Sequence, residues 1–238
     1  MKFESNSKDF LKRRKKLEEE LGFNIWNIAD HFGLYSGGET IARELAVYEI
    51  IKETIDVPGH MAEFGSHIGA NLLFMAKCLE ILQPKSPKEL YSFDSFEGLQ
   101  TYADEDSKKS KKFKSKYVGN EELLRKFIKL HGFEEWVHIV KGDILESLEK
   151  FIDKNKHVMF SLIYLDVDLY LPTKKILHCC DPIMSQGGII VFDEAFYELW
   201  QGETVALKEF LSETSSQYKM NTIPFVKRPS LYMTKISS

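Results

Sequence analysis

Short apolar runs alternate with segments of helical periodicity from residue 60 onward. This alternation constrains the fold more than any other feature, because it is typical of a mostly parallel sheet covered by helices. Strands are predicted at residues 60–65, 89–95, 137–143, 160–168 and 187–195. Helices are predicted at residues 69–82, 120–131, 144–155, 172–184 and 203–217. We therefore expect an α/β fold with helices on both faces of the sheet.

The tail at residues 221–236 does not continue this alternation of strands and helices. Two short strand-like pieces flank residues 227–230 (KRPS), as they would in an antiparallel hairpin on the edge of a sheet. Together with the five earlier strands, this pattern predicts a mostly parallel seven-stranded sheet with a C-terminal antiparallel hairpin.

The part before residue 60 is predicted to be helical, with a turn at residues 36–38 (SGG). A chain of 238 residues is within reach of a single α/β domain. We interpret residues 1–58 as an N-terminal helical cap or lid, and residues 59–238 as the main domain that it covers.

Residues 98–119 show no apolar periodicity and contain KKSKKFKSK, six lysines in nine residues. Such a charge run is usually a solvated loop. Long loops in compact domains are also often lids, so we expect a mobile lid loop here. Whether its lysines contact an acidic substrate stays open at this point.

Composition excludes several classes of protein. No segment has the roughly 18 uncharged apolar residues of a membrane helix, and the charged N-terminus lacks the apolar core of a secretion signal. Cys78, Cys179 and Cys180 show no CxxC spacing. A net charge of −4 argues against a nucleic-acid binder. We expect a cytoplasmic protein with neither a nucleic-acid nor a membrane partner.

The first three strand ends suggest a nucleoside-like ligand, because ligands bind at the carboxyl ends of strands in such sheets. Glu63 precedes a turn with Gly65 and Gly69, although the spacing is not GxGxxG. Asp94 could accept hydrogen bonds from ribose hydroxyls or cap a turn. Asp143 could hold an adenine or form the N-cap of a helix.

The last two parallel strands end in four acids. Asp166 and Asp168 follow one strand, and Asp193 and Glu194 follow the next. Neighbouring parallel strands would bring these carboxylates together, which favours a bound cation, and oxygen ligands favour Mg²⁺ over Zn²⁺. The alternative is separate helix caps and salt bridges to lysines.

Two histidines could reach this crevice. His67 lies in the glycine turn and His31 in the predicted cap, whereas His178 fits a packed or surface position on a helix. A histidine is a candidate general base where geometry permits.

The order and spacing of several motifs resemble the macrocin O-methyltransferase (TylF-like) family, which methylates sugar hydroxyls. These motifs are AEFGSHIG, YSFDSFEGL, KGDILESL, LDVDLYLPT and GGIIVFDEAFYELWQG, and the resemblance extends from about residue 34 to 210.

The resemblance implies a Rossmann-like class I methyltransferase fold with S-adenosylmethionine as methyl donor and Mg²⁺ or another divalent cation beside the acceptor hydroxyl. By position, it assigns the donor site to Glu63, Gly65, Ser66, Gly69, Asp94, Ser95, Asp143 and Ile144. It assigns the metal to Asp166, Asp193 and Glu194.

The expected function is therefore methylation of a hydroxyl on a sugar or sugar-bearing small molecule, such as a natural product or a surface-polysaccharide precursor. Asp166 is expected to take part in catalysis, with Asp168 or His67 as proton acceptor. The alternatives are a metal-dependent methyltransferase of a catechol-like phenol and a non-catalytic protein that binds S-adenosylmethionine or a nucleotide. The resemblance also makes a homo-oligomer plausible.

Overall fold

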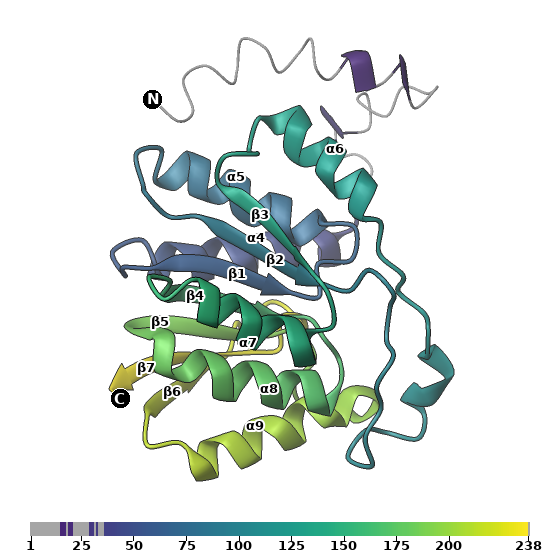
Figure 1. Cartoon of the computed structure of the whole chain (residues 1–238), viewed down its shortest axis with the longest axis vertical. Helices are drawn as coiled ribbons and strands as arrows, with labels where there is room; N and C mark the ends of the chain where they lie inside the picture. The colour runs from purple at the N-terminus through teal and green to yellow at the C-terminus, as the bar shows by residue number, and fades with distance from the viewer. Residues whose placement is uncertain (1–14, 18, 21–28, 31, 33–35, 238) are drawn as a thin grey trace.

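A seven-stranded sheet forms the centre of the protein (Figure 1), as seen in a computed structural model that describes residues 15–17, 19–20, 29–30, 32 and 36–237. Its strand order is β3-β2-β1-β4-β5-β7-β6. The strands are β1 (His60–Phe64), β2 (Leu90–Asp94), β3 (Val137–Lys141), β4 (Phe160–Leu165), β5 (Met184–Phe192), β6 (Gln217–Asn221) and β7 (Leu231–Ser237). The first five are parallel, and β7 pairs antiparallel with both β5 and β6. The predicted fold class is confirmed.

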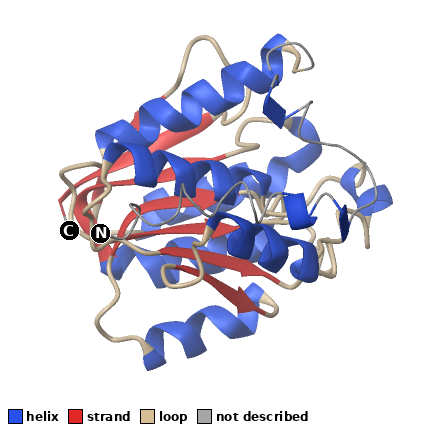
Figure 2. Ribbon diagram, turned by 90° about the horizontal axis from the view of Figure 1, so that it is seen from above, coloured by secondary structure: helices blue, strands red, loops and turns tan. Residues whose placement is uncertain are grey.

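Helices cover both faces of the sheet, with the strands between them (Figure 2). One layer contains α4 (Gly38–Glu53), α5 (Ala70–Leu82) and α6 (Glu121–His131). The other contains α7 (Ile144–Lys154), α8 (Tyr170–Cys180) and α9 (Gln201–Glu213). Short 3₁₀ helices are η1 (Ser110–Phe113), η2 (Asp181–Ile183) and η3 (Glu198–Trp200). Each layer buries its own hydrophobic cluster against the sheet.

The central strands are buried because helices shield both of their faces. Every residue of β4 is buried, and so are the last five residues of β5. Continuous apolar sequence is what such strands require, since neither face meets water. The acids that follow these runs therefore emerge at the first point where the chain leaves the core.

The C-terminal hairpin differs from its prediction. The predicted helix at 203–217 ends at Glu213, and the first hairpin strand is Gln217–Asn221 rather than the segment just before KRPS. Residues 222–230 form the connecting loop, where Pro224 has no N–H to donate to a sheet ladder. The strand β6 lacks an apolar run because it is an edge strand with mostly exposed side chains.

The N-terminal part contributes to the main domain through α4. Its Val47, Ile50 and Ile51 belong to the same buried cluster as α5 and α6. Most of the predicted cap before this helix, including His31, lies outside the described residues. The division at residue 58 stays an interpretation. None of the helices in the described ranges has the length and hydropathy of a bilayer-spanning segment.

Residues 98–119 have a defined fold on the side of the molecule where the parallel strands end. The N–H of Leu99 donates to the Lys116 carbonyl, and the Ser115 N–H donates to the Leu99 carbonyl. The Asp106 side chain, which is buried, accepts from the Tyr170 N–H at the start of α8 at 2.9 Å. These contacts attach the loop to the helices beside it, and its mobility remains a prediction.

Candidate active site

A cavity of about 600 Å³ lies where the five parallel strands end. Eight acidic side chains line it: Asp94, Glu97, Asp143, Glu146, Asp166, Asp168, Asp193 and Glu194. Three basic side chains also line it: Arg43, Lys141 and Arg228. This volume is typical of a small-molecule site. The excess of acid suits a ligand that carries positive charge.

The turn after β1 contains glycines for two different reasons. A Cβ on Gly65 would lie 1.9 Å from the Asp166 carbonyl oxygen, so only glycine lets the ends of β1 and β4 approach each other. A Cβ on Gly69 would lie 2.2 Å from Leu124 of α6, which makes this glycine a packing requirement. Of the two, Gly65 lines the cavity.

Glu63 lies behind this turn and is almost fully buried. Its Oε1 accepts from the Asn71 side chain at 2.7 Å, whereas its Oε2 is buried without a hydrogen-bond partner among the described residues. Burial raises the pKa of Glu63 to about 7. Ser66 is also buried and accepts from the Ser92 hydroxyl. Both side chains support the turn from below and do not line the cavity.

Asp94, at the end of β2, holds the same turn from the other side. Its Oδ2 accepts from the His67 N–H at 2.7 Å, and its Oδ1 accepts from the Phe96 N–H at 2.6 Å. Burial still raises its pKa above the usual value. A carboxylate can accept about four hydrogen bonds, so lone pairs remain for a ligand in the cavity. Ser95 lines the cavity beside it.

Asp143 has one of the two roles that its sequence left open, that of a helix N-cap, and its role in holding an adenine stays a prediction. It is the N-cap of α7, accepting from the Leu145 N–H at 2.9 Å, and it lines the cavity together with Ile144. Its side chain is therefore fixed at the helix start while facing the ligand space.

The strand ends of β4 and β5 bring Asp166 and Asp193 together. The two strands are neighbours, and the Asp193 N–H donates to the Leu165 carbonyl at 3.0 Å. Arg43 of α4 reaches both carboxylates, at 3.2 Å from Asp166 and 3.0 Å from Asp193. Tyr164 donates its hydroxyl to Asp193 at 2.5 Å.

Glu194 is held by a second arginine. Arg228, on the loop between β6 and β7, lies 2.7 Å from Glu194 Oε1. Glu194 Oε2 is buried and has no hydrogen-bond partner among the described residues. Burial raises the pKa of Glu194 to about 7, against the opposing effect of Arg228.

A further buried acid, Glu203 of α9, lies behind Glu194. It accepts from the Glu194 N–H at 3.3 Å, and its own Oε2 has no partner in the described part of the chain. Burial, followed by the charge of Asp193, raises the pKa of Glu203 well above its usual range. The centre therefore holds more acid than its two arginines neutralise.

Asp168 lies on a strained turn between β4 and α8. Its φ of 60° is in the left-handed region, which non-glycine residues seldom adopt, and the Leu169 N–H closes the turn by donating to the Val167 carbonyl. Burial raises the pKa of Asp168 to about 8, and the Glu194 charge adds to this rise. Strained residues of this kind cluster at functional sites.

The macrocin O-methyltransferase (TylF) family model matches residues 41–227. The chain belongs to this family. Its members are O-methyltransferases, so the alternative of a non-catalytic binding protein is excluded. A comparison with curated protein sequences gave no significant match.

Solved structures of other methyltransferases share the fold of this family member. CalS11, a calicheamicin methyltransferase, is 22% identical with a TM-score of 0.78, covering 96% of this chain and 91% of its own. The apo form of CalS11 has a TM-score of 0.69 at 23% identity, covering 96% and 93% of the two chains. The O-methyltransferase NovP has a TM-score of 0.64 at 18% identity, covering 83% and 81%. The macrocin O-methyltransferase fold thus extends over nearly the whole chain.

Two arginines of this family member contact the acid cluster, and the motifs did not reveal them. Arg43 and Arg228 are two of only five arginines, against 27 lysines. Arginine binds carboxylates through a planar fork that lysine lacks. An isolated arginine in an otherwise apolar helix face, as in TIARELAV, is the signal that could have identified Arg43.

His67 lies in the turn after β1, as its sequence position indicates. It lines the cavity beside Asp94, with an exposed side chain and a φ of 53°. Asp168, in contrast, lies close enough to Glu194 and Asp193 for their charges to raise its pKa. Both candidate proton acceptors therefore line the cavity, and Asp168 is the one whose pKa is raised by charges of the acid cluster.

The donor set of the predicted metal site has the chemistry of a hard-cation site. Asp166, Asp193 and Glu194 offer only oxygen, and Glu194 Oε2 has no hydrogen-bond partner among the described residues. In the structure Arg43 pairs with Asp166 and Asp193, and Arg228 pairs with Glu194. No three metal-ligating side chains in the described ranges are arranged to hold a metal ion. A cation would therefore have to replace the guanidinium of Arg43 between Asp166 and Asp193.

Proposed function

We propose that this enzyme transfers a methyl group from S-adenosylmethionine to a hydroxyl of a sugar or sugar-bearing small molecule, and that Mg²⁺ assists the transfer. The observation that carries this proposal is the acid cluster of Asp166, Asp193 and Glu194, which shares one cavity with the turn at Gly65 and with Asp94.

The relatives support the choice of acceptor. The family is described by its action on macrocin, and CalS11 is described as a TDP-rhamnose 3′-O-methyltransferase. A further structure of the same fold, an O-methyltransferase from Bacillus cereus with a TM-score of 0.54 and 15% identity, is a complex with SAH. These descriptions favour a sugar hydroxyl as acceptor and S-adenosylmethionine as donor.

The donor side of the cavity suits S-adenosylmethionine. Its sulfonium and ammonium groups are positive, which matches the acidic lining of the cavity. Asp94 retains lone pairs for ribose hydroxyls. Asp143 and Ile144 line the same space at the start of α7, where an adenine would fit.

On the acceptor side, Asp166, Asp193 and Glu194 would hold the cation. When bound, a divalent cation supplies Lewis acidity that lowers the pKa of an alcohol. In this proposal Asp168, which lines the cavity, takes the hydroxyl proton as the new O–C bond forms and the donor's C–S bond breaks. Orienting the two reactants can contribute up to about 7–11 kcal/mol to such a displacement. Tyr117 and Trp200 line the cavity.

The test measures methyl transfer by the purified protein with S-adenosylmethionine, Mg²⁺ and a panel of sugar-bearing and phenolic acceptors, with and without chelator. We expect turnover on a sugar hydroxyl that chelator abolishes and Mg²⁺ restores. Undiminished turnover in chelator would exclude the cation, and transfer only to phenols would exclude the sugar. Calorimetry without acceptor tests the donor separately, and absence of S-adenosylmethionine binding would refute the proposal.

A further inference from the structure

The loop at residues 98–119 carries positive charge on an acidic protein. It contains six lysines and three acidic residues, while the whole chain has a net charge of −4. The cavity beside it is lined by eight acidic and three basic side chains. The molecule thus presents a basic segment next to an acidic interior.

Hydrogen bonds define the backbone conformation of the part of the loop that carries the lysines. Ser110–Phe113 form the 3₁₀ helix η1, and the Lys114 N–H donates to the Lys111 carbonyl at 3.2 Å. Tyr102 donates its hydroxyl to the Ser110 carbonyl at 3.0 Å. Residues three apart on a 3₁₀ turn are eclipsed, so Lys111 and Lys114 lie on the same side.

An aromatic contact attaches η1 to the rim of the cavity. The ring of Phe113 lies 5.4 Å from Trp200 and stacks on Tyr117 at 5.8 Å. Both partners line the main cavity. The lysines on either side of Phe113 are therefore held near the cavity entrance.

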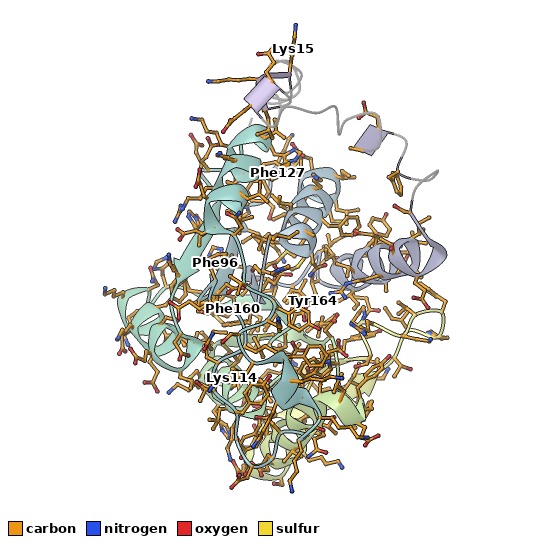
Figure 3. All side chains as sticks on the ribbon, turned by 90° about the vertical axis from the view of Figure 1, so that its right-hand side faces the viewer. Lys15, Phe96, Lys114, Phe127, Phe160 and Tyr164 are labelled. Atoms are coloured by element: carbon orange, nitrogen blue, oxygen red, sulfur yellow. The ribbon has the colours of Figure 1, made fainter. Side chains whose placement is uncertain are left out.

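Lys111 and Lys114 line a recess of about 420 Å³ together with Gln100, Thr101 and Tyr102. Gln100 and Thr101 line the main cavity as well. The recess therefore continues from the space in which the acceptor would bind. Lys114 is labelled on the segment that faces the viewer in Figure 3.

The lysines of this loop differ in the partners that they contact. Lys109 pairs with Glu198 at 2.6 Å, and Lys112 lies over the Phe113 ring. Neither Lys111 nor Lys114 forms an ion pair with any acid in the described part of the chain. Lys114 is therefore available to an anion from outside. Lys111 is available as well, although its charge also acts on the buried carboxyl of Asp106 and opposes the rise in the pKa of that group.

We infer that the recess binds a phosphate or diphosphate group attached to the sugar acceptor, with Lys111 and Lys114 as its cationic ligands and Thr101 and Gln100 as hydrogen-bond donors. This inference rests on the proposed function, because it assigns the anion to the acceptor. A cationic donor in the acidic cavity and an anionic acceptor tail in the basic recess give each substrate its own complementary charge.

The first experiment measures pyrophosphate binding by calorimetry in the full-length protein, without donor or acceptor. We expect K111Q/K114Q to weaken binding about tenfold, as the loss of two partly exposed charge contacts implies. The matched control is K108Q/K116Q, which removes the same charge from the same loop at lysines outside the recess. The control should weaken binding no more than about twofold.

Equal weakening in the two double variants would overturn the site, since it would show that only the loop's total charge matters. Absence of pyrophosphate binding by the unaltered protein would overturn it as well. Thermal melting of both variants checks that they fold, and a wild-type melting temperature in K111Q/K114Q removes misfolding as an explanation.

The second experiment compares a nucleoside diphosphate-linked sugar with the same sugar as a neutral glycoside in the methyl-transfer assay. K111Q/K114Q should reduce the preference for the phosphate-bearing acceptor about tenfold, through KM, whereas the control double variant should retain it. An unchanged preference would overturn the inference while leaving the methyltransferase proposal intact. Pyrophosphate binding without turnover on any sugar would refute the proposed function instead.

A phosphate could also belong to a lipid. Vesicles of phosphatidylcholine containing phosphatidic acid test this source by sedimentation. We expect no binding that depends on Lys111 and Lys114, because the recess continues into the cavity that is proposed to hold the soluble acceptor. Binding to vesicles that is lost in K111Q/K114Q, without binding of pyrophosphate, would overturn the soluble diphosphate as the ligand.

Discussion

Replacing Arg43 by methionine should destabilise the ligand-free enzyme by about 3 kcal/mol. The guanidinium lies 3.0 Å from Asp193 and 3.2 Å from Asp166, and it is the cation shared by these two carboxylates. Methionine retains much of the apolar stem but none of the charge. The variant therefore leaves two adjacent acids without their common counterion.

The magnitude follows from charge and burial. Two unit charges about 4 Å apart attract by roughly 4 kcal/mol at an effective dielectric constant of about 20, and removing one partner of a buried pair costs about 3–5 kcal/mol. Solvent reaches the side chains of Arg43 and Asp166, which are 29% and 30% exposed, so the lower end applies. For a chain of this size the melting temperature should fall by about 6–12 °C.

Thermal melting with and without Mg²⁺ is the assay. In R43M no guanidinium competes with a cation, so Mg²⁺ should raise the melting temperature of the variant more than that of the wild type. The difference between the free energies of unfolding of wild type and R43M should also shrink as the pH falls. Burial already raises the pKa of Asp166, and loss of Arg43 raises it further. As the pH falls, Asp166 is therefore protonated at a higher pH in R43M than in the wild type, which removes its repulsion with Asp193.

The control is R125M, which removes an exposed arginine that pairs with Glu121 one helical turn away. It should cost no more than about 0.5 kcal/mol. Equal melting temperatures for R43M and wild type would refute the reasoning about the counterion. Equal Mg²⁺ shifts in both proteins would refute the competition between Arg43 and the cation.

Three further changes test other parts of the structure. Asp166→Asn should lower kcat/KM for methyl transfer at least about 100-fold while largely sparing the Kd for S-adenosylmethionine, and a loss below tenfold would contradict its place at the reaction centre. Gly65→Ala should cost roughly 2–4 kcal/mol in chemical denaturation, because its Cβ would lie 1.9 Å from a backbone oxygen, whereas Gly37→Ala meets no atom within 4 Å. Similar stabilities of the two variants would disprove that contact. Lys88 donates to the carbonyls of residues 54 and 57, and burial lowers its pKa to about 8. Between pH 8 and 10.5 the unfolded chain therefore binds more protons at this lysine than the folded chain does. The free energy of unfolding of the wild type, relative to that of Lys88→Met, should rise over this range. A constant difference would show that burial does not lower the pKa of Lys88.

The sheet could be predicted from the sequence because burial on both faces requires continuous apolar strands. The same reasoning placed Asp166 and Asp193 on neighbouring strand ends, and the hydrogen bond from the Asp193 N–H to the Leu165 carbonyl confirms that adjacency. Strand β6 was misplaced because an exposed edge strand needs no apolar run. The pattern of apolar residues therefore predicts buried strands, and it does not predict an exposed edge strand such as β6.

The arginines could not be predicted from motifs. Arg43 is 150 residues from Asp193 in sequence, and it reaches the acid cluster from a helix that packs beside the sheet. Local patterns identify which strand an acid follows but not which distant side chain neutralises it. The packing of α4 on α5, which no pattern in the motifs specifies, decides that contact.

The two counterions of the acid cluster come from opposite ends of the described chain, one from α4 and the other from the loop before β7. During synthesis, Arg228 leaves the ribosome after all of the acids that line the cavity. A nascent chain that has formed its five parallel strands still contains an unbalanced group of buried carboxylates, whose mutual repulsion opposes compaction. Completion of the C-terminal hairpin supplies Arg228, so the finished chain is the first species in which Glu194 has its arginine partner.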